Sequence, residues 1–201
     1  MPTKYFHFLN EDKNTQFDAP LNSQQCIHII PRTGQQCKRR VVIGSPCCFQ
    51  HCDDKYNLQI KNSTIPNAGV GIFAFNKNKQ QQRKPVFKED TMIVPYHGEL
   101  INKRQLNQRY GNKTAPYAVQ LSKYYEDGAI QRGIGSLANT KNKTHNNAIL
   151  TYRETKPRTA QLKATKNIYH GQEILVDYGD EYRLNERGAK HSTNNYKNRL
   201  N

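Results

Sequence analysis

Short apolar runs, each about one strand long, recur between residue 60 and about residue 182 and are separated by Gly, Pro and Asn. They are rich in Val, Ile, Tyr or Phe, which is typical of β-strands bounded by turns. Helical patterning is scarce, and Asn102–Tyr110 is the best short helix candidate. The pattern therefore predicts a mainly β fold with short helices. The predicted strands are Gly71–Phe75, Met92–Tyr96, Tyr117–Leu121, Ala148–Tyr152, Ala160–Ala164 and Ile174–Tyr178.

Three segments depart from this pattern. Residues 1–22 are polar and show little periodicity, residues 76–84 (NKNKQQQRK) are of low complexity, and residues 183–201 are basic with almost nothing to bury. The predicted organisation is a flexible N-terminal arm over 1–22, a small cysteine-containing module over 23–56, a strand-rich domain over 57–182 and a basic, disordered tail over 183–201. The segment 76–84 is expected to be a solvent loop between strands.

The charge balance is strongly basic, with 31 Lys and Arg against 16 Asp and Glu and a net charge of +15. Such a charge favours a polyanionic partner such as nucleic acid. The lysines are spread thinly, however, and Lys, Asn, Ile and Tyr are all plentiful, as an AT-rich coding sequence would produce. The one tight basic cluster is Lys38-Arg39-Arg40. The charge alone leaves a polyanion contact and an ordinary solvated surface equally open.

All five cysteines fall between Cys26 and Cys52, whereas a secreted disulfide fold would spread them along the chain. No stretch approaches about 18 apolar residues, and the first residues lack the apolar segment of a secretory signal. We therefore expect an intracellular protein of the nucleus or cytoplasm, with a local metal site. Free buried thiols are the alternative.

Zinc takes four thiolate or imidazole ligands in a tetrahedron. Turns at 33–34 and 44–46 can fold the chain back, and Cys48-x-x-His51 can close the site. Cys47, Cys52 and His28 are further candidates, so the spacing alone leaves the choice of ligands open.

The segment resembles a small Cys-Cys-Cys-His module of the form C…G-x-x-C-[KR]-R…G-x-x-x-C-x-x-H. The resemblance implies Cys26, Cys37, Cys48 and His51 as ligands of Zn²⁺. Four protein ligands leave no open position, so this zinc would be structural. The basic cluster inside the module would be placed to contact phosphate or an acidic protein.

Four later segments, in order, resemble the SET domain of protein lysine methyltransferases over roughly residues 60–182. Residues 67–74 (NAGVGIFA) are similar to G-x-G-[IVL]-F-A, and residues 93–101 (IVPYHGELI) to Y-x-G-E-[VL]-I. Residues 127–139, followed by Asn147-Ala148, are similar to the stretch that ends in R-F-x-N-H and P-N-A. Residues 171–179 (GQEILVDYG) are similar to G-E-E-L-T-x-D-Y-G. A lone G-x-G would be weak evidence, but four ordered blocks are specific.

This resemblance implies a SET-type β fold of several small curved sheets. It also implies an S-adenosylmethionine-dependent protein-lysine N-methyltransferase that acts on histone-like or other basic proteins as a chromatin regulator. Tyr178 would be catalytic, and Tyr96 would line the substrate channel. The cofactor-binding residues implied are Gly69, Val70, Gly71, Asn139, Thr140, Tyr178 and, from its position alone, Tyr182. Taken singly, each has a plainer interpretation as a strand-entry turn, a packed aromatic or a turn residue.

The third block departs from the family pattern. Thr140 stands where the family has His, the Cys of that motif is missing, and about two extra residues precede Asn147. These departures keep one alternative open, a SET module that binds without catalysing. A second alternative is a nucleic-acid-binding adaptor that uses the zinc module and the basic tail.

Overall fold

The computed structural model of the chain describes residues 5–9, 15–20, 24–41, 46–111, 115–130, 132–142, 144–153 and 159–178. Within these ranges most regular structure is strand, and only two short α-helices occur. The expected mainly β class is therefore confirmed. The strands are β1 (Tyr5–Leu9), β2 (Thr15–Pro20), β3 (Gln24–Gln25), β4 (Arg40–Val41), β5 (Leu58–Asn62), β6 (Val70–Ala74), β7 (Met92–Pro95), β8 (Glu99–Ile101), β9 (Ala118–Leu121), β10 (Tyr124–Asp127), β11 (Ala148–Tyr152), β12 (Ala160–Ala164) and β13 (Val176–Asp177). The helices are α1 (Phe49–Tyr56), α2 (Lys103–Tyr110) and the 3-10 helices η1 (Lys79–Gln81) and η2 (Ile134–Leu137).

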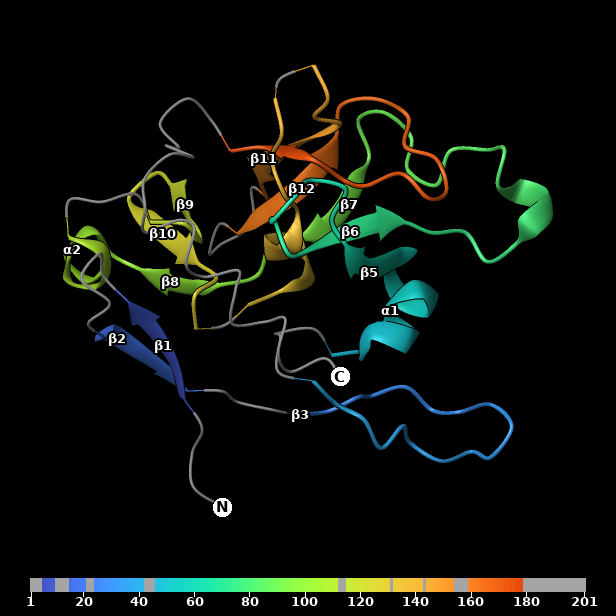
Figure 1. The fold of residues 1–201 in the computed structure, drawn as a ribbon, viewed down its shortest axis with the longest axis horizontal. Coiled ribbons are helices and arrows are strands. Elements are labelled where there is room, and N and C mark those ends of the chain that lie inside the picture. Colours follow the sequence, from blue (N-terminus) through green and yellow to red (C-terminus); the bar gives the residue numbers. More distant parts are fainter. Residues whose placement is uncertain are drawn as a thin grey trace.

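The strands form several small sheets instead of one large one (Figure 1). The largest has the order β13-β11-β12-β7, in which β11 and β13 are parallel and the other pairs antiparallel. A second, antiparallel sheet has the order β8-β10-β9, and β5 pairs with β6 beside them. This arrangement confirms the expected set of small sheets.

The main hydrophobic core lies between the four-stranded sheet and the β5–β6 pair. Along β12 the side chains of Ala160, Leu162 and Ala164 are buried while the residues between them are less so, as expected when one face of a strand covers a core. Ile72 of β6 and Ile174 are both fully buried, and the Ile174 N–H donates to the Ile72 carbonyl at 2.8 Å. The segment before β13 is thereby fixed against β6.

The structure reproduces the predicted strands closely, with shifts of one or two residues at their ends. The predicted helix is present as α2. The Asn102 side chain accepts from the Gln105 N–H and the Gln105 side chain accepts from the Asn102 N–H, which is a reciprocal cap that defines the start of the helix.

The N-terminal arm differs from the expectation, because residues 5–9 and 15–20 pair as antiparallel strands. The run Tyr-Phe-His-Phe-Leu at 5–9 is aromatic and favours a strand, although the residues that follow it are polar. The solvent loop predicted at 76–84 contains the short helix η1. Tyr182 and the predicted tail over 183–201 lie outside the described residues, and no helix among the described residues is long and apolar enough to cross a membrane.

Candidate functional site

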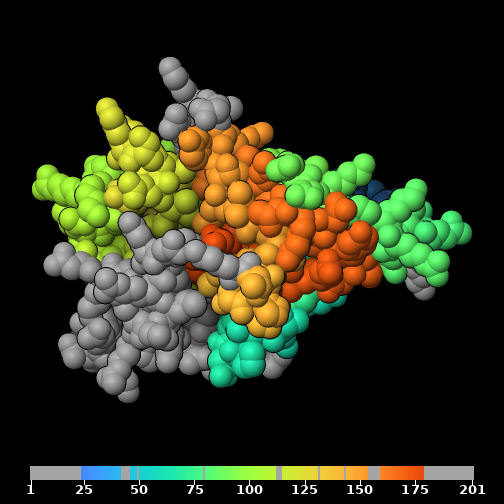
Figure 2. All heavy atoms as spheres, turned by 90° about the horizontal axis from the view of Figure 1, so that it is seen from above, coloured from blue at the N-terminus to red at the C-terminus, as the bar shows by residue number. Residues whose placement is uncertain are grey.

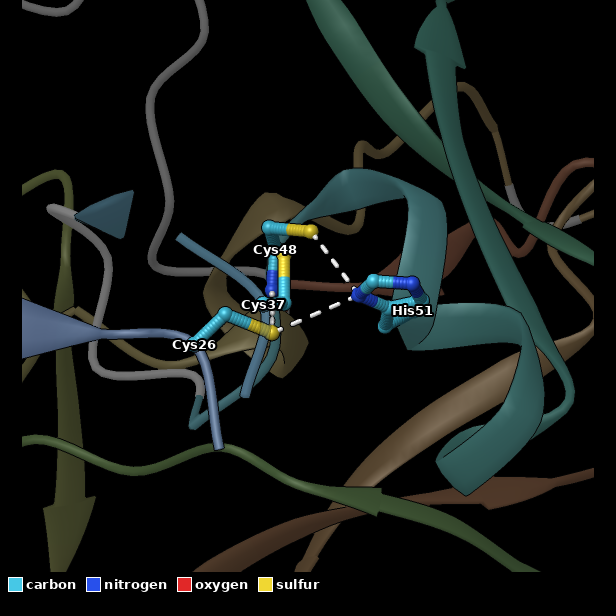
Figure 3. Close-up of side chains that lie close together, drawn as sticks. All are labelled: Cys26, Cys37, Cys48 and His51. Atoms are coloured by element: carbon cyan, nitrogen blue, oxygen red, sulfur yellow. Dashed lines mark hydrogen bonds between the residues drawn. The ribbon is translucent and has the colours of Figure 1, made fainter. Parts of the chain in front are cut away.

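The first site is a cluster of three cysteines and a histidine (Figure 3). The ligand atoms of Cys26, Cys37, Cys48 and His51 all lie within 4.8 Å of one another. Figure 3 shows the His51 ring with its nitrogen directed at two of the sulfurs, at 3.5 Å from Cys26 Sγ and 3.3 Å from Cys48 Sγ. The structure thus brings together the four residues that the sequence resemblance implied.

Local structure explains why these four residues meet. Cys26 directly follows β3 and donates its N–H to the Arg39 carbonyl, while the Cys37 N–H donates to the His28 carbonyl. The two segments therefore run side by side, and Cys26 and Cys37 are buried. Cys48 is the N-cap residue of α1, and the His51 N–H donates to its carbonyl at 2.9 Å. One helical turn then places both side chains on the same side of the helix.

Two distances from the His51 nitrogen match those of a tetrahedral zinc ion. Bond lengths of about 2.3 Å to sulfur and 2.0 Å to nitrogen place a sulfur and a nitrogen about 3.5 Å apart in a tetrahedron. The two sulfur–nitrogen distances, 3.5 and 3.3 Å, agree with that separation. Three thiolates and one imidazole are also the donors that zinc prefers.

The protonation of the cluster without metal depends on burial and on hydrogen bonds. Burial raises the pKa of the Cys48 thiol to about 11. Burial also acts to raise the pKa of the Cys26 thiol, but hydrogen bonds, first among them that from the Cys48 N–H at 3.3 Å, lower it. Burial lowers the pKa of His51, so its imidazole is neutral at pH 7 and able to bind a metal.

Cys47 and Cys52 are not among the four clustered residues, although both are buried. The Cys52 thiol instead donates to the Cys47 carbonyl at 3.6 Å. His28 lies just outside the cluster, where its ring stacks on that of His51 with 3.7 Å between centroids. The geometry therefore separates the candidates that the spacing alone could not.

The basic cluster Lys38-Arg39-Arg40 lies beside the metal cluster, and its three residues are exposed. Ile27 and Ile29, on the neighbouring segment, are 49% and 53% exposed. The module therefore presents basic and apolar side chains together on its surface.

The second site is a pocket between the three-stranded and four-stranded sheets. Tyr96 and Tyr178 both line it, and small or apolar residues make up most of the rest. Figure 2 shows the red-orange atoms of the end of the described chain at the surface between the yellow-green residues of the three-stranded sheet and the orange residues of β11 and β12. The lining residues are Tyr96, Ala115, Pro116, Ala118, Val119, Gly135, Ser136, Ala138, Leu150, Val176 and Tyr178.

Both tyrosine hydroxyls are held by backbone carbonyls. Tyr178 donates to the Ala138 carbonyl at 2.6 Å, and Tyr96 donates to the Tyr117 carbonyl at 2.8 Å. Burial, with a smaller effect of nearby Tyr178, raises the pKa of Tyr96 well above its usual range. Tyr96 is therefore a neutral phenol at physiological pH.

The backbone of Tyr96 is enclosed by glycines. A Cβ at Gly133 would lie 2.4 Å from the backbone carbonyl oxygen of Tyr96, and one at Gly135 would lie 2.6 Å from the backbone carbonyl oxygen of Pro95. The turn that leads into η2 can therefore pack on this strand end only because both positions are glycine.

Residues around Asn139 connect the tyrosine pocket to the turn at Gly69 and Val70. Asn139 forms a parallel bridge with Leu175, and the Val176 N–H donates to its carbonyl at 2.8 Å. Its side-chain Nδ2 donates to the Val70 carbonyl at 3.0 Å. The structure thus brings Val70, Asn139 and Tyr178 together from three distant parts of the sequence.

Gly71 lies close to two side chains of the chain itself. A Cβ at this position would lie 2.2 Å from Glu173 Oε1 and 3.1 Å from Asn139 Nδ2, so the glycine makes room for these two side chains. Gly69 has a positive φ of 76°, as a tight turn requires. Thr140 accepts a hydrogen bond from Asn146 Nδ2 at 3.3 Å and begins the loop that carries the extra residues.

Several buried charged residues near these sites gave no separate signal in the sequence. Asp127 is fully buried and accepts from Tyr110, Arg109 and the Ala129 N–H. Arg132 is also buried, and its guanidinium lies 3.7 Å from the centre of the Tyr117 ring, the residue that holds the Tyr96 hydroxyl. Glu173 was visible only as one letter of the fourth block. Burial and pairing in three dimensions, which sequence pattern does not show, set these residues apart.

Comparison with known proteins agrees with this architecture. Residues 84–179 match the family model described as the SET domain. A crystal structure of an active polycomb repressive complex 2 in the stimulated state matches with a TM-score of 0.50 and 21% identity over 64% of this chain and 16% of that chain. The crystal structure of the Chaetomium thermophilum polycomb repressive complex 2 matches with a TM-score of 0.49 and 21% identity over 63% and 16%. No curated protein matches the chain.

The chain spans 16% of the length of these structural neighbours, so the likeness concerns the fold of one domain. The first block, over residues 67–74, precedes the part matched by the family model, but the structure pairs it with Asn139 and Glu173 inside that part. The family match, the set of small sheets and the four blocks therefore agree. The chain therefore contains a SET domain over residues 84–179 and carries a Cys/Cys/Cys/His cluster of the zinc-knuckle kind on its N-terminal side.

Proposed function

We propose that the protein is an S-adenosylmethionine-dependent protein-lysine N-methyltransferase. The observation that carries the proposal is the pair of phenols, Tyr96 and Tyr178, which line one pocket and are both anchored on backbone carbonyls. A pocket with small and apolar walls and two fixed oxygens suits a long aliphatic side chain that ends in an amine.

The residues implied for the cofactor fit such a ligand. Val70, Asn139, Thr140 and Tyr178 are all half-buried, so each is accessible from solvent while held in place by the fold. Asn139 and Val70 are in direct contact, and Tyr178 bonds to the residue before Asn139. When bound, S-adenosylmethionine supplies a methyl group on a sulfonium, which is transferred in line to the amine.

The pocket acts on the lysine in two ways. A lysine side chain has an ordinary pKa of about 10.4 and must be neutral to attack, and an apolar channel disfavours the ammonium by desolvation. Holding the amine in line with the reacting carbon then removes an entropic cost of about 7–11 kcal/mol when alignment is ideal.

The hydrogen-bond directions define the role of each phenol. Tyr178 donates its hydrogen to the Ala138 carbonyl and Tyr96 donates its hydrogen to the Tyr117 carbonyl, so each phenol would meet a ligand as an acceptor and not as a donor. Acceptor oxygens can orient the N–H bonds of the amine and the polarised hydrogens of a methyl group. The raised pKa of Tyr96 argues against a phenolate base at this position.

We propose a histone-like or other basic protein as substrate, in the nucleus. The structural neighbours are polycomb repressive complexes, and a basic enzyme suits a target that is held on DNA.

We propose that the cysteine–histidine cluster binds one structural Zn²⁺, because its four protein ligands leave no open position.

The test is transfer of labelled methyl from S-adenosylmethionine to core histones by the wild type, Tyr178→Phe and Tyr124→Phe. Tyr124 is 57% exposed and does not line the pocket, so its variant controls for loss of a phenol as such. We expect label with the wild type and Tyr124→Phe, and a loss of about 10²-fold or more with Tyr178→Phe. Undiminished activity of Tyr178→Phe would overturn the assigned mechanism.

The replacement of the family His by Thr140 favours one other candidate, a SET module that binds without catalysing. Calorimetry with S-adenosylmethionine separates the cases. Binding without label on any protein indicates a different substrate or a binding module, and no saturable heat would reject the proposal itself.

A further inference from the structure

We propose that Glu173 is a positioning residue that orients the side-chain amide of Asn139, so that its oxygen receives the ammonium of the cofactor's amino-acid portion. The inference rests on the proposed function, because it assumes that a ligand of this chemistry binds beside Asn139. It assigns a role to a buried carboxylate that has no part in the mechanism proposed for Tyr96 and Tyr178.

Glu173 is 7% exposed, yet its carboxylate is fully engaged. Oε1 accepts from Ser63 Oγ at 2.7 Å and from Asn139 Nδ2 at 3.3 Å. Oε2 accepts from the Thr64 N–H at 2.8 Å and from the Thr64 hydroxyl. Glu173 is the acceptor in all four contacts, an arrangement that suits the charged form of a carboxylate.

This carboxylate has no cationic partner among the described residues. Within the described part of the chain Glu173 makes no ion pair, and all four of its donors are neutral. A buried carboxylate that is bonded but not neutralised leaves a negative potential around it, which favours a positive charge close by.

The amide of Asn139 is fixed by the same contacts. Its Nδ2 donates to the Val70 carbonyl and to Glu173 Oε1, and both are acceptors that could not face the amide oxygen. The orientation of the amide is therefore set by its neighbours.

The amide oxygen is consequently left on the open side. No described residue donates to Asn139 Oδ1, and no buried side-chain oxygen or nitrogen among the described residues lacks a hydrogen-bond partner. Oδ1 is therefore accessible to solvent, next to the turn at Gly69 and Val70. It offers an acceptor beside an uncompensated negative charge, which together recognise an ammonium group.

Gly71 makes the contact between Glu173 and Asn139 possible. A side chain there would lie 2.2 Å from Glu173 Oε1, so a Cβ would push the carboxylate away from the amide. The glycine thus allows the carboxylate to reach Asn139.

Replacing Glu173 by Gln tests the orientation, because Gln has the same shape and only one acceptor oxygen. The Thr64 N–H requires that oxygen, which leaves the Gln NH₂ facing Asn139. The Asn139 amide then meets a donor on one side and the Val70 carbonyl on the other, and no single orientation satisfies both. We expect the fixed acceptor at Oδ1 to be lost.

The experiment measures the affinity of the full chain for S-adenosylhomocysteine and for its analogue with the amino group replaced by hydrogen, by calorimetry. We expect the wild type to bind the amino compound at least about tenfold more tightly than the analogue, and we expect this ratio to fall to about twofold or less in Glu173→Gln. A merely structural role would weaken both ligands equally and leave the ratio unchanged.

Ser63→Ala is the matched control, because it removes one neutral donor from the same oxygen and leaves the Asn139 contacts in place. Its ratio should stay within about twofold of the wild type. An unchanged ratio in a folded Glu173→Gln would overturn the inference. If that variant fails to fold, the wild type decides, since equal affinity for the two ligands would also overturn it. If the wild type binds neither ligand, the proposed function itself fails.

Discussion

The two adjacent cysteines at the start of α1 allow a sharp test of the metal site. Cys48 belongs to the four-residue cluster, whereas its neighbour Cys47 does not, although both lie in the same hydrophobic core. Both are buried, and Cys→Ser removes a thiol in each case with nearly the same change in volume. We expect Cys48→Ser to weaken zinc binding strongly and Cys47→Ser to leave one zinc bound per chain.

The magnitude follows from sharing the metal's binding energy among its ligands. A structural zinc contributes about 10–16 kcal/mol at pH 7, so each of four ligands accounts for about 2.5–4 kcal/mol. At about 1.4 kcal/mol per tenfold change, loss of one ligand lowers the affinity by about 10²- to 10³-fold. A change at Cys47 affects only packing and hydrogen bonding, about 1–2 kcal/mol of unfolding free energy.

Competition with a chromogenic chelator measures the zinc affinity of each variant, and elemental analysis after gel filtration gives the stoichiometry. Thermal unfolding with and without chelator then shows whether the metal stabilises the fold, because a ligand that binds only the folded state raises its melting temperature. Equal losses of affinity in the two variants would show that the geometric assignment of the ligands is wrong.

Two further changes probe the framework around the pocket. Tyr110→Phe removes a phenol that donates to fully buried Asp127 at 3.0 Å, and we expect a loss of about 1.5–3 kcal/mol in urea unfolding at pH 7. Burial raises the pKa of Tyr110 above its unfolded value near 10, so the free energy of unfolding of the wild type falls by about 1.4 kcal/mol per pH unit above about pH 10. Tyr110→Phe lacks this phenol, so the difference in stability between wild type and variant should shrink above about pH 10. A difference that stays constant there would contradict this reasoning. Gly133→Ala places a Cβ 2.4 Å from the backbone carbonyl oxygen of Tyr96 and should lower the free energy of unfolding by about 3 kcal/mol or more. The matched change Gly128→Ala, whose nearest contact is 3.3 Å, should lower it by about 1 kcal/mol. A similar fall in melting temperature for both glycine variants would contradict the packing assigned to Gly133.

The strands that the sequence predicts are those in which apolar side chains cover the core. β12 is such a strand, with Leu162 fully buried between two buried alanines. β10 was missed because its sequence, Tyr-Tyr-Glu-Asp, looks like a surface segment. Glu126 and Asp127 are in fact buried, the first accepting from the Gly98 and Ala160 N–H groups and the second from Tyr110. Only partners distant in sequence make such burial possible, so local pattern cannot reveal it.

The clustering of the cysteines predicts a metal site, but the choice of its four ligands comes from the resemblance to a known module and not from the chemistry of the residues. Five cysteines with the same burial and the same donor atom differ only in where the fold directs their sulfur atoms. The geometry that excludes Cys47 and Cys52 from the cluster comes from α1, a helix for which the polar segment 49–56 gave no clear pattern. The boundaries of the domains, by contrast, stay predictions.

Glu173 illustrates the same limit at the second site. Its place in the fourth block was visible, but a Glu among Gly, Gln and Ile looks like any exposed residue of a turn. Its contacts are with Ser63 and Thr64, about 110 residues earlier, and with Asn139. The role of a polar residue is set by what the fold brings to it, whereas the role of an apolar strand residue is mostly set by its own pattern.

The cysteine–histidine cluster and the turn at Gly69 and Val70 belong to one continuous core, which bears on why the two occur together. α1 carries Cys48 and His51, ends at Asn57 in the left-handed conformation and leads directly into β5. β5 pairs along its whole length with β6, and its last residue, Asn62, pairs with Val70 beside the glycine turn. Cys52 and Ile72 lie in the same buried cluster. If the cluster binds zinc as we propose, loss of the metal frees the helix that leads into β5. The disturbance then reaches the turn beside Asn139 through packing alone, without any zinc chemistry in the tyrosine pocket.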